Sequence, residues 1–128
     1  MLLYITLGSN DLARARRFYD AVMPTIGVHF LRGDEAEIGY GPTGATDPLL
    51  WINHPYDGNP ATIGNGSMPA FTAPTRAAVD AFHAAALANG GTDEGEPRLR
   101  YSPNFYSAYV RDPDGNKLSA VCNSQTEG

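Results

Sequence analysis

The stretches LGSNDLARARRFYDAV (residues 7–22) and FTAPTRAAVDAFHAAA (residues 71–86) decide the fold of this chain, because they carry one pattern twice. When the two are superposed, Phe18 meets Phe82, and the copies are 64 residues apart, half of the 128-residue chain. A repeat of half the chain length indicates two similar modules, related most simply by a pseudo-twofold axis. The concave seam between two such modules is the natural place for a ligand.

Each copy is expected to form a helix between strands. In the first, capping residues at 9–11 precede apolar side chains at helical spacing, and Pro24 ends the pattern. In the second, Thr75 is an N-cap residue and the Asn89-Gly90-Gly91 run is a C-cap signal. The helices are therefore expected to occupy equivalent places in the two modules.

Short apolar runs bounded by turn residues predict the strands. In the first module these are residues 2–7, 27–31, 35–40 and 49–53. In the second they are residues 68–72, 105–111 and 117–122, while 92–103 reads as irregular with room for one short strand near 99–101. The expected fold class is α+β: two βαβββ modules in tandem that form a curved, partly open mixed sheet around a central cleft.

The whole chain is expected to be one domain, since about 128 residues suit a single hydrophobic core. Module one covers about residues 1–55, and module two covers about residues 68–123. Between them, residues 56–67 are rich in Gly, Asn and Pro and read as a linker.

Alternation along each strand divides its side chains between two faces. Leu3, Ile5 and Leu7 form an apolar set that is expected to pack under the first helix. In the last strand, the alternate set that should pack under a helix comprises Leu118, Ala120 and Cys122. The opposite face carries Tyr, Trp, Met, Ser and Asn, a mixture that is typical of a pocket lining.

Composition excludes several classes of function. The formal net charge is −5 and Lys117 is the only lysine, so the basic patch that nucleic-acid binding requires is missing. Cys122 is the only cysteine, which excludes an internal disulfide and a zinc site of the CxxC type. The acidic balance mildly favours a neutral or cationic ligand, although most acidic proteins are simply soluble.

No membrane partner is expected, because no run of the sequence approaches the roughly 18 apolar residues of a membrane span. The beginning of the chain, MLLYITLGSN, lacks the basic region of a signal peptide. A cytoplasmic protein is the expectation that follows.

The paired modules, the opening ITLGSNDLARARRFYDAV and the ending AYVRDPDGNKLSAVCN resemble the glyoxalase/bleomycin resistance protein/dioxygenase superfamily, also called the vicinal oxygen chelate fold. The resemblance runs from about residue 2 to residue 122. It implies a divalent metal held on the concave face by one ligand from the first and fourth strands of each module, usually His, Glu, His or Gln, and Glu. That metal chelates neighbouring oxygens of the substrate in the family's enzymes.

The family's ligand positions hold other residues in this chain. Matched one by one, they fall on Tyr4, Trp51, Met68 and Ser119, with a register uncertainty of one or two residues at Trp51. A phenol, an indole, a thioether and a hydroxyl are all poor ligands for these cations. This departure from the family's ligand set predicts a site with no metal and no other cofactor, closer in chemistry to the family's bleomycin-binding members, which sequester a small molecule.

The candidate ligand-binding residues combine this set with nearby polar side chains: Tyr4, Trp51, Asn53, Met68, Tyr101, Tyr106 and Ser119. Tyr56 is a further polar candidate beside them. The aromatic and thioether side chains can clamp a flat or apolar ligand, or they can fill a pocket that their own side chains close. Both interpretations stay open, and no catalytic residue is assigned.

Two functions are weighed. In the first, the protein is a metal-free, homodimeric binder of a small organic molecule, the dimer being implied by the resemblance. In the alternative, it is a lyase, isomerase or dioxygenase that uses either a divalent metal at a displaced site formed by His29, Glu37 and His54, or metal-free acid–base catalysis by a tyrosine or histidine. This alternative rests on analogy of fold, which is a weak argument for function.

Overall fold

A computed structural model describes residues 1–124 of the chain. Module one contains, in order, β1 (Ile5–Gly8), α1 (Leu12–Val22), the short 3₁₀ helix η1 (Met23–Ile26), β2 (Val28–Gly33), β3 (Glu37–Pro42) and β4 (Leu50–Asn53). Module two contains β5 (Ala70–Thr72), α2 (Arg76–Ala88), β6 (Thr92–Leu99), β7 (Phe105–Arg111) and β8 (Lys117–Asn123). The order βαβββ occurs twice, as the repeat predicts.

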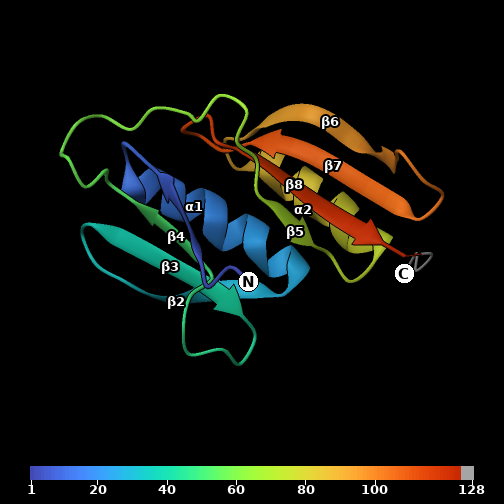
Figure 1. Ribbon diagram of the computed structural model, residues 1–128, viewed down its shortest axis with the longest axis horizontal. Helices are drawn as coiled ribbons and strands as arrows, with labels where there is room; N and C mark the ends of the chain where they lie inside the picture. Colours follow the sequence, from blue (N-terminus) through green and yellow to red (C-terminus); the bar gives the residue numbers. More distant parts are fainter. Residues whose placement is uncertain (125–128) are drawn as a thin grey trace.

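The two modules build sheets of the same topology. One sheet has the strand order β1-β4-β3-β2 and the other the order β5-β8-β7-β6. The first strand of each module runs parallel to the fourth, and the remaining pairs are antiparallel. Both sheets are open, and the modules lie side by side with a long loop connecting β4 to β5 (Figure 1). The expected α+β class and tandem arrangement are confirmed.

The helices begin where the capping residues predict. The side chain of Asp11 accepts a hydrogen bond of 3.0 Å from the backbone N–H of Arg14, and Thr75 accepts one of the same length from Ala78. Each bond satisfies an N–H group that the first helical turn leaves without an intrahelical partner. The first helix gives way to η1 one residue before Pro24, which lacks the N–H that a longer α-helix would use.

One strand was missed by the sequence pattern. The stretch read as irregular contains β6, an eight-residue strand that ends at Leu99, where the short strand was expected to begin. Its register with β7 shifts on either side of Gly95, so apolar and polar side chains do not alternate. Pro97 is tolerated because β6 is an edge strand. Beyond it, Tyr101 lies in a turn with a positive φ of 65°.

The core lies between the sheets and the two helices. The helices supply Phe18, Tyr19 and Val22 from α1, and Val79, Phe82 and Ala86 from α2. The strand face predicted from Leu118, Ala120 and Cys122 is buried against them, as expected. The prediction that Leu3 packs under the first helix was wrong. Leu3 precedes β1 and is 81% exposed, because the strand begins only at Ile5.

A polar joint connects the modules at the turn between β7 and β8. The hydroxyl of Tyr19 donates a 2.5 Å hydrogen bond to Asp112, and the side-chain amide of Asn116 donates one of 2.9 Å to the carbonyl of Gly8. Burial is the largest cause that raises the pKa of the Asp112 carboxyl and of the Tyr19 phenol. The DPDGN motif therefore fixes module two against the end of β1.

No helix within residues 1–124 is long and apolar enough to cross a membrane.

Candidate functional site

The registers of the two sheets place the four substituted family positions in equivalent pairs. Trp51 lies beside Thr6 in one sheet, and Ser119 lies beside Ala70 in the other. Thr6 and Ala70 are themselves 64 residues apart. Tyr4 and Met68 each precede one of these two residues by two positions. The registers therefore give Trp51 and Ser119 equivalent places in the two modules.

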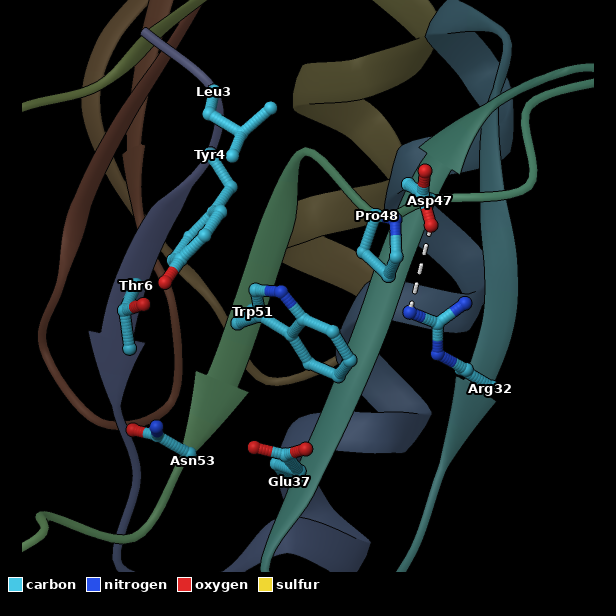
Figure 2. Close-up of a pocket in the computed structure, with 9 residues that line it drawn as sticks. All are labelled: Leu3, Tyr4, Thr6, Arg32, Glu37, Asp47, Pro48, Trp51 and Asn53. Carbon is cyan, nitrogen blue, oxygen red and sulfur yellow. Dashed lines mark ion pairs between the residues drawn. The ribbon is translucent and has the colours of Figure 1, made fainter.

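A cavity of about 450 Å³, here called the Trp51 cavity, lies on the concave face of module one. It is lined by Leu3, Tyr4, Thr6, Arg32, Glu37, Asp47, Pro48, Trp51 and Asn53. In Figure 2 the Tyr4 ring and the indole of Trp51 border the same space, and Glu37 and Asn53 lie at its lower end. Three of the sequence-predicted residues, Tyr4, Trp51 and Asn53, thus meet here.

The indole occupies this position because its neighbour on β3 has no side chain. Gly39 is paired with Trp51, and a Cβ at Gly39 would stand 2.8 Å from the indole Cζ3 and 2.6 Å from Cγ of Pro48. Real Cβ atoms essentially never approach that closely. The ring therefore lies over the glycine, next to Pro48, and offers part of its surface to the cavity.

Charged groups occupy two sides of the Trp51 cavity. The guanidinium carbon of Arg32 is 5.6 Å from the centroid of the indole, and its Nη2 is 3.7 Å from a carboxylate oxygen of Asp47 (Figure 2). Glu37 forms no ion pair with any residue that the structure describes. Glu37 and Asn53 are paired across β3 and β4, so an acceptor and an amide stand side by side.

A second, more apolar cavity of about 470 Å³, here called the Met68 cavity, lies between the beginnings of β1 and β5. It is lined by Leu2, Leu3, Tyr4, Ile5, Leu49, Met68, Pro69, Ala70 and Phe71. Tyr4 and Leu3 belong to both cavities. Tyr4 is 51% exposed and therefore forms a wall that a ligand in either cavity can contact.

Ser119 is placed differently from its partner position Trp51. It is fully buried, and its Oγ has no hydrogen-bond partner within residues 1–124. It is paired with Tyr109, whose ring has the cationic groups of Arg100 and Lys117 at 4.9 Å and 5.6 Å from its centroid. Ser119 lines neither the Trp51 cavity nor the Met68 cavity.

The three remaining tyrosine candidates lie outside both cavities. Tyr101 is 89% exposed and Tyr56 is fully exposed. Tyr106 turns towards α2, where its hydroxyl donates a 2.7 Å hydrogen bond to Asp80. This hydrogen bond is the largest cause that raises the pKa of Tyr106 to about 12.

The residues present do not fit a divalent metal. Tyr4, Trp51, Met68 and Ser119 offer no imidazole or carboxylate, and no group of three or more His, Cys, Asp or Glu side chains is gathered anywhere in the described part of the chain. The displaced set of His29, Glu37 and His54 is therefore not assembled. The Nδ1 atom of His54 instead lies 3.1 Å from the carbonyl oxygen of Ser9.

The other residues that line the Trp51 cavity were not among the predicted ligand-binding residues: Leu3, Thr6, Arg32, Glu37, Asp47 and Pro48. Thr6 and Glu37 flank β4, and only the registers of β1 and β3 with that strand bring them to Trp51. One signal was available in the sequence. The alternate glycines Gly39 and Gly41 leave two gaps on one strand face, which favours a large neighbour.

A family model and a solved structure both relate this chain to one superfamily. The family model described as Glyoxalase/Bleomycin resistance protein/Dioxygenase superfamily matches residues 1–119. The crystal structure of a glyoxalase/bleomycin resistance protein from Albidiferax ferrireducens is 40% identical, covers 92% of this chain and 94% of its own, and superposes with a TM-score of 0.81. No curated protein matches.

More distant solved structures share the fold alone. A glyoxalase/bleomycin resistance protein/dioxygenase family enzyme from Burkholderia phytofirmans is 21% identical, with a TM-score of 0.70 over 94% of this chain and 96% of its own. A lactoylglutathione lyase from Agrobacterium tumefaciens is 22% identical, with a TM-score of 0.64 over 94% of this chain and 92% of its own.

Proposed function

Since the chain belongs to the Glyoxalase/Bleomycin resistance protein/Dioxygenase superfamily, we propose that it is a metal-independent member that binds and sequesters a small organic molecule. One observation carries the proposal. The resemblance matches the family's metal-ligand positions to Tyr4, Trp51, Met68 and Ser119, and two of these residues, the aromatic Tyr4 and Trp51, line one cavity of about 450 Å³. A cavity of this size suits a drug-sized or smaller ligand.

The chemistry of the lining defines what such a ligand must offer. The Tyr4 and Trp51 rings supply flat, polarisable surface, which favours an aromatic or other planar group. Thr6 and Asn53 supply hydrogen-bonding groups at fixed places on β1 and β4. Binding therefore relies on stacking and on a few directed hydrogen bonds.

Ligand screening tests this proposal directly. Trp51 is the only tryptophan, so its fluorescence reports on the cavity without any label. Planar metabolites that bind should change this fluorescence and raise the melting temperature, since a ligand at about 100 times its Kd stabilises the folded state by about 2.7 kcal/mol. Tyr4→Ala should weaken binding, whereas Tyr56→Ala, at an exposed tyrosine outside the cavity, should not.

A broad library that neither raises the melting temperature nor changes Trp51 fluorescence would count against small-molecule binding. Metal content provides a separate test. Untagged protein from medium supplemented with nickel, manganese, iron and zinc should contain almost no metal by mass spectrometry. Close to one metal ion per chain would overturn the metal-independent assignment, and metal-dependent turnover would then be assayed.

We also propose a homodimer. Leu2 and Leu3, each 81% exposed, line the Met68 cavity together with Tyr4 and Met68, and such an exposed apolar patch favours a covering partner. Light scattering should give twice the mass of the chain, and Leu3→Glu should shift the mass towards the monomer. A monomeric wild type would contradict this part of the proposal.

A further inference from the structure

We propose that a third cavity, at the junction of the two modules, is a subsite for an oxyanion and that Lys117 is its cationic contact. The inference rests on the proposed small-molecule binding and adds the chemical class of the ligand, a planar compound that bears a carboxylate or a phosphate. The cavity, here called the Lys117 cavity, measures about 220 Å³. Its walls come from β1, the linker, the start of β5 and the start of β8.

Lys117 has no counter-charge among residues 1–124. It is the first residue of β8, on the face opposite the helices, and its ammonium lies 5.6 Å from the centroid of the Tyr109 ring. No carboxylate within residues 1–124 forms an ion pair with it. A partly buried ammonium beside an aromatic ring keeps its other donors for water or for an anionic ligand.

The two acidic residues nearest in sequence are engaged elsewhere. Asp114 accepts hydrogen bonds from the guanidinium of Arg14 at 2.8 Å and from the backbone N–H of Asn10 at 2.9 Å. Asp112 accepts from Tyr19 and Asn116. Both carboxylates are therefore held in the joint with module one, and neither is paired with Lys117.

Hydrogen-bond donors suited to an oxyanion line the same cavity. Thr6, Thr62 and Ser67 contribute hydroxyl-bearing side chains to its walls. The backbone N–H groups of Thr62 and Gly64 donate to no residue that the structure describes. Free amides and hydroxyls near a cation form the kind of environment that binds phosphates and carboxylates.

The linker that carries these donors is held in place. The side chain of Asn10 accepts a 2.7 Å hydrogen bond from the backbone N–H of Ala61 and donates one of 3.1 Å to its carbonyl. Two residues further on, Ile63 lies against Gly115, where a Cβ would stand 2.8 Å from its Cγ2. A wall fixed at both points is pre-organised, which lowers the entropy that binding must overcome.

The Lys117 cavity adjoins the Trp51 cavity, because Thr6 lines both. The ligand of this proposal extends past Thr6, with its planar group on Trp51 and its anionic group at Lys117. Glu37 lies on β3, two strands away from β1 within module one, whereas Lys117 lies across β1 in module two. This charge distribution orients the ligand, with its anionic end towards module two.

Three small probes of similar shape test the subsite: benzoate, phenyl phosphate and the neutral benzyl alcohol, with inorganic phosphate as a fourth probe that has no ring. Binding is followed by Trp51 fluorescence and by calorimetry. At least one of the two aromatic anions should bind about tenfold or more tightly than benzyl alcohol, as expected of a charge-assisted hydrogen bond. The order of benzoate and phenyl phosphate then distinguishes a carboxylate ligand from a phosphate ligand.

The variants give the decisive comparison. Lys117→Met removes the charge but keeps an extended chain, and it should abolish the preference for anions. The matched control, Arg17→Met, removes a charge from an exposed position on α1 and should leave the preference intact. Unchanged melting temperatures verify that both variants fold, and Lys117→Gln serves as a second charge-removing variant if Lys117→Met unfolds.

Equal affinity for benzoate, phenyl phosphate and benzyl alcohol, unaffected by Lys117→Met, would overturn the oxyanion subsite and leave small-molecule binding intact. Failure of the broad ligand library would instead overturn the proposed function itself. Inorganic phosphate separates the two cases further, because its binding at Lys117 needs no contact with Trp51. If neither phosphate nor either aromatic anion binds, the subsite is wrong whatever the library shows.

Discussion

The two modules fill one equivalent residue pair, here called the rung, in opposite ways. The rung joins the third and fourth strands of each sheet. In module one the small residue is Gly39 on the third strand, and the large one is Trp51 on the fourth. In module two the large residue is Tyr109 on the third strand, and the small one is Ser119 on the fourth. Each rung carries one ring, but the ring stands on a different strand.

This exchange explains why the surroundings of the ring differ between the two modules. The Trp51 ring, on β4, borders a cavity together with Tyr4, which directly precedes β1. The Tyr109 ring, on β7, instead lies near the cationic groups of Arg100 and Lys117, and the Ser119 beside it is buried. The comparison teaches that the repeat preserves the helix-facing core while the opposite face is free to specialise.

The largest expected effect tests the part that the modules share. Phe18→Ala and Phe82→Ala remove fully buried rings at equivalent places in the repeat, and each should destabilise the protein by about 3–5 kcal/mol. Urea unfolding of both variants measures the losses. The equivalence fails if one substitution costs only a small fraction of the other.

The next effect tests the polar joint between the modules, where Tyr19 bonds to Asp112, rather than a feature that the two modules share. Tyr19→Phe deletes the hydrogen bond to Asp112 and should cost about 1.5–3 kcal/mol at neutral pH, as for other bonds to charged groups. The hydrogen bond from Tyr19 lowers the pKa of Asp112, although burial has the larger effect and raises it. The free-energy cost of Tyr19→Phe should therefore be full where the carboxylate is ionised, and it should shrink as the carboxylate protonates at lower pH.

Stability of wild type and Tyr19→Phe, measured from neutral pH downwards, tests this sign. Because burial raises the folded-state pKa of Asp112 above the ordinary value of 3.8, the change should begin above that value. A difference that stays constant across the whole range would contradict an ionised Asp112. Thr25→Val, which removes a hydroxyl bonded to a backbone carbonyl within module one, provides a control without a carboxylate partner.

The opposite packing of the rung can itself be tested. Gly39→Ala places a methyl group where the indole and Pro48 stand, and it should cost about 1–3 kcal/mol and shift the Trp51 emission. Part of that cost should disappear in the Trp51→Ser background, giving a coupling of at least about 0.5 kcal/mol in a double-mutant cycle. Strictly additive losses would show that the ring and the glycine are energetically independent.

The smallest effect is expected at the other member of the rung. Ser119→Ala removes a buried hydroxyl whose oxygen has no partner in the described part of the protein, so the change should be neutral or stabilising by up to about 1 kcal/mol. Thermal unfolding measures it, with Ser107→Ala as the control that loses a bonded hydroxyl. A clear loss at Ser119 would indicate an unrecognised hydrogen bond at that position.

Local pattern was sufficient for most of the fold. The helix caps at Asp11 and Thr75 were readable because the signal lies within one turn of the chain. The pattern failed at β6, where register shifts beside Gly95 break the alternation of apolar and polar side chains. It also failed at Leu3, because the apolar run begins before the strand does. In both places pairing with a neighbouring strand, which is a tertiary property, set the outcome.

The candidate site was only partly predictable for the same reason. Tyr4 and Trp51 could be named because the resemblance matches them to the family's ligand positions, and Asn53 because it lies on the same face of its strand as Trp51. Thr6 and Glu37 join them through registers that connect distant segments, and Lys117 meets the linker only once the modules are docked. Local periodicity does not encode contacts between segments that are distant in the sequence.

The sequence by itself determined the two-module fold, the helix-facing core and the residue types at the four positions matched to the family's ligands, because periodicity and residue identity are local properties. The tertiary structure decided which side chains share a cavity. A pairing such as Thr6 with Trp51 depends on the register between strands 45 residues apart, and the Lys117 cavity depends on how one module packs against the other. Both are set by the packing of the whole chain.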